Sequence, residues 1–367
     1  MSDTDAITDF PANRWWVAGF DWELTDKPLA RTLLGHRLVL FRTSDGAVSA
    51  LEDRCCHKEL PLSLGTLEQR GLRCGYHGLL FNHGGQCIEA PGQARIPGRA
   101  RVRAFDLRER NHILWIWIGA EGVQPDIEPP AYAFHDDPAY SYGGDSFHYD
   151  APWQLIHDNL LDLSHLGYVH VKTIGGNAAV HMNAQVQVSG DERSVRVVRW
   201  LPDSVPPPTY TAAWPFKANV DRWQEIDFKI SHCEIWTGGM DVGTQSLDDP
   251  GRHGFHMRGF HGVTPETLHT AHYFWTVATN PHPDKQNITD LVVSQTAATF
   301  LEDKVIIEAQ WQNQQRFPGR SQVYLNIDAG PTRARRIIDQ LCGSTSRTTA
   351  APVEDRAMTS APNPGAV

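Results

Sequence analysis

Cys55-Cys56-His57 and Cys74-Gly75-Tyr76-His77, separated by sixteen residues, decide the fold of this chain. Each segment pairs one cysteine with one histidine, in the patterns C-x-H and C-x2-H. A [2Fe–2S] cluster in which two histidines replace two cysteines on one iron requires this ligand set. A structural Cys2His2 zinc site uses the same donors, but its pairs are usually spaced more widely and its histidines usually lie together on a helix. The sequence favours the cluster, and its predicted ligands are Cys55, His57, Cys74 and His77.

A second group of candidate ligands follows the pattern Asn159-x2-Asp162-x2-His165-x4-His170. Two imidazoles and one carboxylate on one face of Fe(II) leave the other face open, which is typical of non-heme iron oxygenases. Histidines five residues apart are rotated by about 140° on a regular helix, so we expect a helix break, at Gly167. The alternative is a pair of unrelated surface histidines. The cluster sequence upstream favours the iron site.

Length and composition limit the classes of function. The chain has 367 residues, enough for two domains, and a net charge of −10, which argues against general binding to nucleic acid. Residues 1–10 lack the basic and apolar runs of a secretory signal, and no stretch reaches the roughly 18 consecutive apolar residues of a membrane span. The six cysteines show no disulfide framework. We therefore expect a cytoplasmic enzyme with no membrane or nucleic-acid partner.

The order of predicted elements indicates an α+β protein. Short strands and glycine turns predict a small antiparallel β domain over residues 12–122. Residues 123–342 begin with a proline-rich linker and continue as a curved antiparallel sheet packed with helices. Residues 343–367, rich in Ser, Thr, Ala and Pro, are predicted to be disordered. In the second domain the expected strands are 142–150, 184–189, 194–201, 223–232, 253–263 and 269–279, and the expected helices are 153–171, 292–316 and 332–341.

The segments around the cysteines resemble a known family. Arg54 to His57, Pro61 to Gly65 and Leu72 to Gly78 are similar to the Rieske domain of aromatic-ring oxygenases, and more narrowly to the oxygenase components of vanillate and dicamba O-demethylases. The family usually reads Cys-Pro-His-Arg-Gly at the first pair, whereas this chain reads Cys55-Cys56-His57-Lys58-Glu59. Cys56 is therefore a spare thiol beside the cluster, and we expect that it is not a ligand.

The resemblance continues through the second domain. It is carried by Asp158 to His165, Thr264 to Thr267, His272 to Trp275 and Leu325 to Gly330, and it implies a helix-grip, START-like catalytic domain. A carboxylate flanked by large apolar residues pairs, binds metal or shifts its pKa. The segment Phe300-Leu301-Glu302-Asp303-Lys304 is similar to the one in which the family places its iron carboxylate. The match gives Asp303 as the third iron ligand, with Glu302 and Glu308 as less favoured substitutes.

Three further residues take roles from the same resemblance. His261 matches a histidine that lines the pocket and binds substrate, although it could also be a buried strand histidine with a satisfied hydrogen bond. Asn159 matches a residue beside the iron, or else forms ordinary helix hydrogen bonds. Asp162 lies one turn before His165, so its carboxylate can accept a hydrogen bond from that ring, or it is an ordinary helix carboxylate. The family forms trimers, and an aspartate at this position bridges the iron to the neighbouring subunit's cluster, at the histidine matching His77.

The resemblance implies the terminal oxygenase of a multicomponent system. The chain has no flavin or nicotinamide fingerprint, so electrons from NAD(P)H would arrive through a separate ferredoxin or reductase. With O2 as co-substrate, the enzyme would hydroxylate an alkyl carbon on the oxygen or nitrogen of an aromatic substrate and release an aldehyde. One alternative is a ring cis-dihydroxylase with the same metals. A simple electron carrier is the other, but it would have no use for His165, His170 and Asp303.

Overall fold

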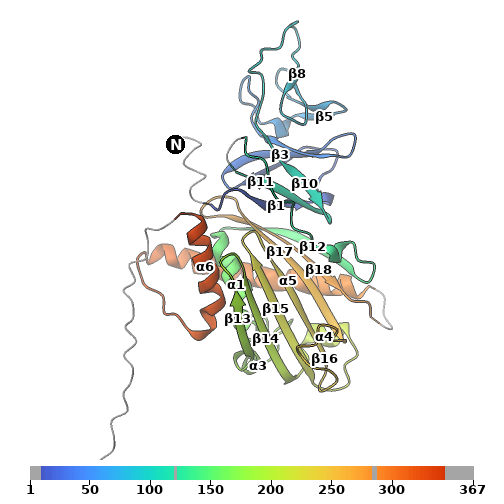
Figure 1. Ribbon diagram of the computed structural model, residues 1–367, viewed down its shortest axis with the longest axis vertical. Helices are drawn as coiled ribbons and strands as arrows, with labels where there is room; N and C mark the ends of the chain where they lie inside the picture. The colour runs from blue at the N-terminus through green and yellow to red at the C-terminus, as the bar shows by residue number, and fades with distance from the viewer. Residues whose placement is uncertain (1–9, 120–121, 283–286, 344–367) are drawn as a thin grey trace, which may run out of the picture.

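The protein is described here from a computed structural model, which covers residues 10–119, 122–282 and 287–343. The tail predicted to be disordered lies, apart from its first residue, outside the described residues. The chain forms a small β-rich part above a larger part built on one broad sheet (Figure 1). No helix in the described ranges combines the length and the apolar character needed to cross a membrane.

The N-terminal part consists of three antiparallel sheets, as the sequence predicts for this domain. The first sheet has the order β1-β11-β10, the second β2-β3-β4-β9 and the third β5-β6-β7-β8. The third sheet carries both cysteine segments, between its strands and just before them. The strands are β1 Arg14–Phe20, β2 Leu29–Leu33, β3 His36–Arg42, β4 Val48–Glu52, β5 Thr66–Glu68, β6 Gly71–Arg73, β7 Leu80–Phe81, β8 Cys87–Glu89, β9 Ala104–Phe105, β10 Leu107–Arg110 and β11 Ile113–Ile118.

The larger part is a seven-stranded antiparallel sheet of order β12-β18-β17-β16-β15-β14-β13. Its strands are β12 Ser141–Tyr149, β13 Gln185–Gly190, β14 Val195–Ser204, β15 Val220–Lys229, β16 His232–Asp241, β17 Phe255–Pro265 and β18 Ala271–Thr279. The long helix α5, Ile288–Arg316, crosses one face of the sheet (Figure 1). The other helices are α1 Trp153–Leu161, α2 Leu166–Val169, α3 Ala178–Met182, α4 Pro208–Ala213 and α6 Ala329–Leu341. A sheet gripped by helices agrees with the predicted α+β class.

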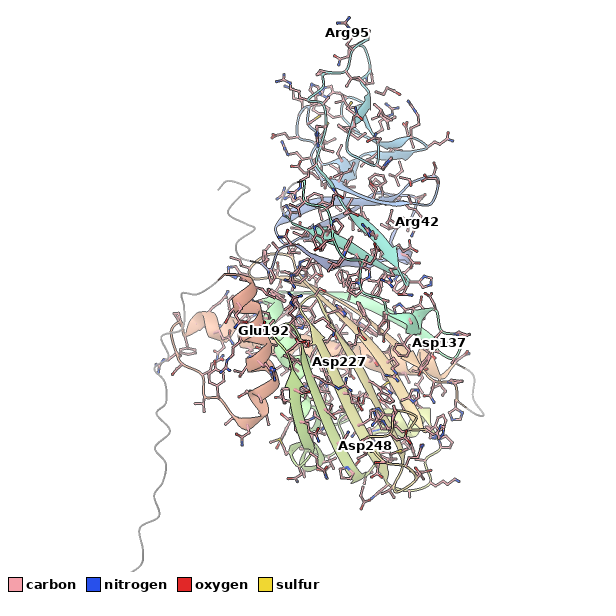
Figure 2. All side chains as sticks on the ribbon, in the orientation of Figure 1. Arg42, Arg95, Asp137, Glu192, Asp227 and Asp248 are labelled. Atoms are coloured by element: carbon pink, nitrogen blue, oxygen red, sulfur yellow. The ribbon has the colours of Figure 1, made fainter. Side chains whose placement is uncertain are left out.

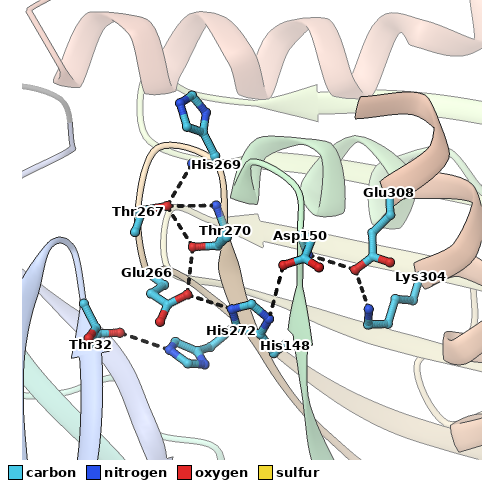
Figure 3. A network of polar contacts seen from close by, with 10 residues as sticks. All are labelled: Thr32, His148, Asp150, Glu266, Thr267, His269, Thr270, His272, Lys304 and Glu308. Atoms are coloured by element: carbon cyan, nitrogen blue, oxygen red, sulfur yellow. Dashed lines mark hydrogen bonds and ion pairs between the residues drawn. The ribbon is translucent and has the colours of Figure 1, made fainter. Parts of the chain in front are cut away.

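The two parts share a core. Aromatic and aliphatic side chains of β1 and β11 pack against Phe260 of β17 and Phe274 of β18 in one buried cluster. The Thr264 hydroxyl donates to the Val17 carbonyl oxygen at 2.7 Å. Near the start of β18, the ring of His272 lies 3.0 Å from the Thr32 carbonyl oxygen. Beside it, a separate chain of polar contacts runs from Glu266 through His148 and Asp150 to Glu308 of α5 (Figure 3). This contact zone fixes the β-rich part on the sheet, with Arg95 at one extreme of the molecule and Asp248 near the other (Figure 2).

Two features of the larger part differ from the sequence prediction. The predicted strand 223–232 corresponds to most of β15, but it ends in a turn at residues 230–231, and the strand β16 that follows was not predicted; Lys229 pairs with His232 across the turn. The expected helix 153–171 does break, but the prediction of a break at Gly167 is wrong. Helix α1 ends at Asp162, which takes the extended conformation with φ −119° and ψ 92°. Its carboxylate then accepts a hydrogen bond from the backbone N–H of Ser164, which caps the short 3-10 helix Leu163–His165.

Gly167 permits close helix packing rather than a helix break. It lies inside α2, where a Cβ atom would be 2.2 Å from the Cα of Ala178. Glycine therefore allows α2 and α3 to approach each other closely. His165 lies in the 3-10 helix and His170 is the C-cap of α2, with φ −111° and ψ 38°, and their ring centroids are 5.4 Å apart.

Candidate metal centres and active site

The two cysteine segments fold into loops with the same backbone pattern. The amide of Cys55 donates to Leu60, and the amide of Cys74 donates to Leu79, at 2.9 and 2.8 Å. Four residues after each cysteine the backbone is left-handed, with φ 60° at Glu59 and φ 74° at Gly78. Two such turns place a cysteine at the base of each loop and a histidine towards its tip.

The burial of the four donors divides them into two pairs. Cys55 and Cys74 are 2% and 3% exposed, whereas His57 and His77 are exposed and their ring centroids lie 4.6 Å apart. Burial, together with the neighbouring Cys74 thiol, raises the pKa of Cys55 to about 11. Two buried thiols with no disulfide between them suit a bound cation, which favours their thiolate forms.

The spacing of these donors distinguishes a binuclear cluster from a single zinc ion. Around one tetrahedral zinc, S and N ligand atoms lie roughly 3.3–3.8 Å from one another. In the described part of the chain, no three of the four donors bring their ligand atoms within 4.8 Å of one another. A [2Fe–2S] cluster holds its cysteines on one iron and its histidines on the other, so this separation of a buried sulfur pair from an exposed imidazole pair fits it. Cys56 is exposed, unlike the thiols of Cys55 and Cys74.

A second set of donors converges in the larger part. The ligand atoms of His165, His170 and Asp303 all lie within 4.8 Å of one another. The Nε2 atoms of His170 and His165 lie 3.0 and 3.4 Å from the Asp303 carboxylate oxygen Oδ1. When two ligand atoms each lie about 2.1 Å from a metal ion and at right angles to each other, they are about 3 Å apart. The Nε2 atom of His165 is buried and has no hydrogen-bond partner, so this set has the geometry and the unsatisfied atom that a metal ion would complete.

Neighbouring groups orient the three side chains. The Nδ1 atom of His170 lies 2.7 Å from the Glu302 carboxylate, and that of His165 lies 2.6 Å from the backbone carbonyl oxygen of Asp162. Asn159 donates from Nδ2 to the Asp303 carboxylate at 2.9 Å. With each Nδ1 engaged, each Nε2 faces the shared point, as is usual for histidines that bind metal. The expectation that the Asp162 carboxylate receives the His165 hydrogen bond is wrong, because the main-chain oxygen occupies that position.

The other carboxylates considered from sequence point elsewhere. Glu302 faces the outer nitrogen of His170 rather than the convergence point, and Glu308 pairs with Lys304 and accepts from the Asp150 amide. Burial opposes ionisation of Asp303, but its close contacts with His165 and His170 outweigh burial and lower the pKa of Asp303 to about 2. The carboxylate is therefore ionised and available to a cation at any ordinary pH.

A pocket opens beside the three donors. Its wall is mostly apolar, with Leu160, Leu163, Ile235, Val277 and Phe300 among the lining residues. His261 also lines it, is 4% exposed and has Nδ1 2.7 Å from the Tyr273 hydroxyl. Burial lowers the pKa of His261 to about 3, so its imidazole is neutral. A shaped apolar cavity next to three open-faced donors can hold a small aromatic molecule and exclude water.

Sequence reasoning missed part of this wall. Arg222 and Gln224 of β15, Tyr210 of α4 and Thr237 of β16 also line the pocket. The only signal was the period of two in Arg222-Trp223-Gln224-Glu225, which puts the arginine and the glutamine on one face of a strand. Which face is inside is set by the sheet's helices and was not evident from the strand alone.

Comparison with known proteins agrees with this arrangement. Residues 14–105 match the Rieske [2Fe-2S] domain, and residues 149–343 match the vanillate O-demethylase oxygenase C-terminal domain. The chain belongs to the vanillate O-demethylase oxygenase family of Rieske proteins. It is thus an oxidoreductase of the oxygenase type with a [2Fe–2S] domain, as the motifs predict.

Several members of this family are similar over nearly the whole length. A putative toluene-4-sulfonate monooxygenase iron-sulfur subunit from Comamonas testosteroni is 37% identical, over 90% of this chain and 96% of that protein. The dicamba O-demethylase oxygenase component from Stenotrophomonas maltophilia is 34% identical, over 90% and 98%. A crystal structure of dicamba monooxygenase bound to dicamba superposes with a TM-score of 0.84 at 32% identity, over 92% of this chain and 98% of that one. The predicted family, fold class and enzyme class are confirmed.

Proposed function

We propose that this chain is a terminal oxygenase that removes an alkyl group from the oxygen or nitrogen of a small aromatic substrate. One observation carries the proposal: three converging donors with an open side face an apolar pocket, on a chain that also has a Rieske domain. The relatives include vanillate and dicamba O-demethylase oxygenases and a chloroacetanilide N-alkylformylase oxygenase. Residues 12–122 would supply electrons, and residues 123–342 would hold the substrate.

The candidate residues take different roles in this proposal. Cys55, His57, Cys74 and His77 would hold the cluster, and His165, His170 and Asp303 would hold one Fe(II). An Fe(II) at that position supplies activation of O2, with electrons that come from NAD(P)H through a separate ferredoxin or reductase and the cluster. Asn159 keeps the Asp303 carboxylate oriented through its 2.9 Å hydrogen bond. The neutral imidazole of His261 offers the substrate one hydrogen-bonding nitrogen, since Tyr273 engages the other.

The overall reaction balances as a monooxygenation. One oxygen atom of O2 enters a C–H bond of the alkyl group, and the other leaves as water after two electrons and two protons are supplied. The resulting hemiacetal or hemiaminal breaks its C–O or C–N bond, giving an aldehyde and a phenol or amine. On a methyl group attached directly to a ring, the same insertion stops at the alcohol.

We place the enzyme in the cytoplasm as a homotrimer. In that assembly, Asp162 would connect the iron of one subunit to the cluster of the next, through the histidine corresponding to His77. The location of Asp162 supports this role: it follows α1 directly and precedes His165 by three residues, and its carboxylate accepts from the Ser164 amide at 2.9 Å.

Product analysis tests the proposal. The holoenzyme is combined with NADH, a surrogate reductase and a panel of methoxyaromatic acids, N-alkyl anilides and methylated aryl acids. We expect one aldehyde, and one phenol or amine, for each O2 consumed with an alkoxy or N-alkyl substrate that fits the pocket. A cis-dihydrodiol without aldehyde would replace the proposed dealkylation with ring dihydroxylation.

A further inference from the structure

Arg222 is a buried cation in the wall of the active-site pocket. It lies in β15, is 2% exposed and lines the same cavity as His165, Asp303 and His261. Its Nη2 donates to the Ile174 carbonyl oxygen at 3.1 Å, and its guanidinium lies 4.9 Å from the centre of the Tyr210 ring. Its Nε is buried and has no hydrogen-bond partner. The guanidinium of Arg222 thus makes fewer hydrogen bonds than its N–H groups allow.

No acidic side chain compensates this charge. Among the residues that the structure describes, no carboxylate oxygen lies within 4 Å of the Arg222 guanidinium. Burial lowers the pKa of Arg222, opposed only by the Tyr210 hydroxyl. Two other buried arginines have better partners: Arg252, 3% exposed and three residues before β17, forms an ion pair with Glu225, and Arg199 of β14 donates to Gln224 and to the His181 carbonyl oxygen. A buried charge without a partner is costly, so Arg222 is expected to have a partner that comes from outside the chain.

The surroundings of Arg222 are built to keep it in place. It pairs in register with Gly239 of β16, where a Cβ atom would lie 3.3 Å from the Tyr210 ring and 3.5 Å from the Arg222 stem. A side chain at this position would thus touch both the Tyr210 ring and the Arg222 stem. The Tyr210 hydroxyl is 2.7 Å from the Thr237 hydroxyl, which in turn donates to the Trp223 carbonyl oxygen at 3.0 Å. These contacts fix the ring against which the guanidinium rests.

Gln224 adds a second donor to this wall. It is 2% exposed, and its Oε1 accepts a hydrogen bond from Nε of the buried Arg199 at 3.1 Å. With the oxygen engaged, the group that Gln224 has left to offer is its NH2. Because side chains two apart on a strand share a face, Arg222 and Gln224 lie on the same side of β15. The wall thus offers positive charge and N–H donors, with the carboxylate of Asp303 on a different element.

We propose that Arg222 is the specificity-determining residue of an anion subsite, and that the substrate is an aromatic compound with a carboxylate or sulfonate group bound there. The proposal rests on the proposed function and specifies its substrate class. A guanidinium presents parallel N–H groups that match the oxygens of either anion. The anion would supply the missing charge and accept from Nε, while the ring fills the apolar part of the pocket and the alkyl group faces the three metal donors.

A purely structural role is the competing explanation. The hydrogen bond from Arg222 to Ile174 ties the loop after His170 to the sheet, and this alone could keep the residue. A structural role predicts that loss of Arg222 weakens iron binding but does not change the preference for anionic over uncharged aromatic compounds. The anion role predicts the opposite, with iron retained and ligand preference lost.

Binding to the holoprotein separates the two roles without turnover. The protein, with both metal centres and no reductase, is titrated anaerobically by calorimetry with 4-methoxybenzoate, 4-methylbenzenesulfonate and their uncharged amide and sulfonamide. The wild type should bind at least one anion roughly 10- to 100-fold more tightly than its uncharged counterpart. Arg222→Met should remove this preference and keep the iron. The matched control Arg252→Met removes another buried arginine, at a site away from this pocket, and should keep the preference.

Each outcome of the binding experiment supports or contradicts the anion subsite at Arg222. The two anions show whether the subsite takes a carboxylate, a sulfonate or both. Equal binding of anions and amides to the wild type, or an unchanged preference in Arg222→Met, would overturn the inference. If Arg222→Met does not fold, Arg222→Gln, which keeps a polar amide but removes the charge, must show the same loss of preference. Arg222-dependent anion binding without any aldehyde or alcohol formation would instead contradict the proposed function and leave the subsite standing.

Discussion

The Nδ1 atom of His165 lies 2.6 Å from the main-chain oxygen of Asp162, not from its carboxylate. The side chain of Asp162 is thus not needed to orient the histidine. Its carboxylate accepts from the Ser164 amide, a bond that the oxygen of an asparagine can also accept. Removal of the charge can therefore be separated from damage to the iron site.

We expect Asp162→Asn to keep both metal centres and to lose electron transfer between them. Asp158→Asn is the matched control, since Asp158 pairs with Arg335 instead. The cluster of each variant is reduced, substrate and O2 are added, and cluster reoxidation is followed together with product. Asp162→Asn should show slow reoxidation and little product, and the control should behave as wild type. Reoxidation coupled to product at the wild-type rate in Asp162→Asn would remove Asp162 from the electron path.

The second prediction concerns the hydrogen bond between Glu302 and His170. The carboxylate lies 2.7 Å from Nδ1 and makes the imidazole a better ligand, so Glu302→Gln should weaken iron binding by roughly 10- to 100-fold. Iron retention is measured against a competing chelator. Glu308→Gln, two turns along α5 and paired with Lys304, should retain iron as wild type does. Equal retention in both variants would show that Glu302 has no influence on the metal.

Glu59 provides a third test, because it departs from the glycine usual in the family. Its φ of 60° is costly for a residue with a Cβ atom, and its partner Arg54 is an exposed residue at 3.2 Å. We expect Glu59→Gly to stabilise the cluster domain by about 0.5–1 kcal/mol and Gly78→Ala, at the equivalent position, to destabilise it by about 1 kcal/mol. Thermal unfolding of the holoproteins is the measurement. A lower midpoint for Glu59→Gly would show that its side chain contributes more than the backbone strain costs.

Gly259 provides a fourth test, inside the pocket. A Cβ atom there would lie 2.5 Å from Nε2 of His261, so Gly259→Ala should displace the imidazole and leave both metal centres intact. We expect at least a tenfold loss in kcat/KM, measured as aldehyde formation. In a His261→Ala background the same change should have little further effect, because the clash is gone. Additive losses in the double variant would mean that the alanine acts on something other than His261.

The sequence indicated the chemistry of the sites better than their geometry. Cysteine and histidine pairs at C-x-H and C-x2-H spacing have few alternative uses, and the chain indeed matches a Rieske domain. The position of the helix break could not be predicted, because it depends on the extended backbone of Asp162 and on its side chain capping the following 3-10 helix, whereas glycine at 167 suggested a break by flexibility. The hairpin at Ile230-Ser231 was missed because the turn contains none of the strongest turn residues, Gly, Pro, Asn or Asp, and Ile230 continues the apolar pattern of the strand. Arg222 was missed because its importance depends on which face of β15 is enclosed.

The central claim is that one chain holds two different metal centres, and metal analysis of Asp303→Asn tests it most directly. Anaerobically prepared wild type should contain about three irons and two acid-labile sulfides per chain, with two of the irons in the cluster. Asp303→Asn should lose one iron, keep both sulfides and retain the cluster spectrum. Stoichiometric zinc without sulfide in the wild type, or three irons retained in the variant, would contradict the account.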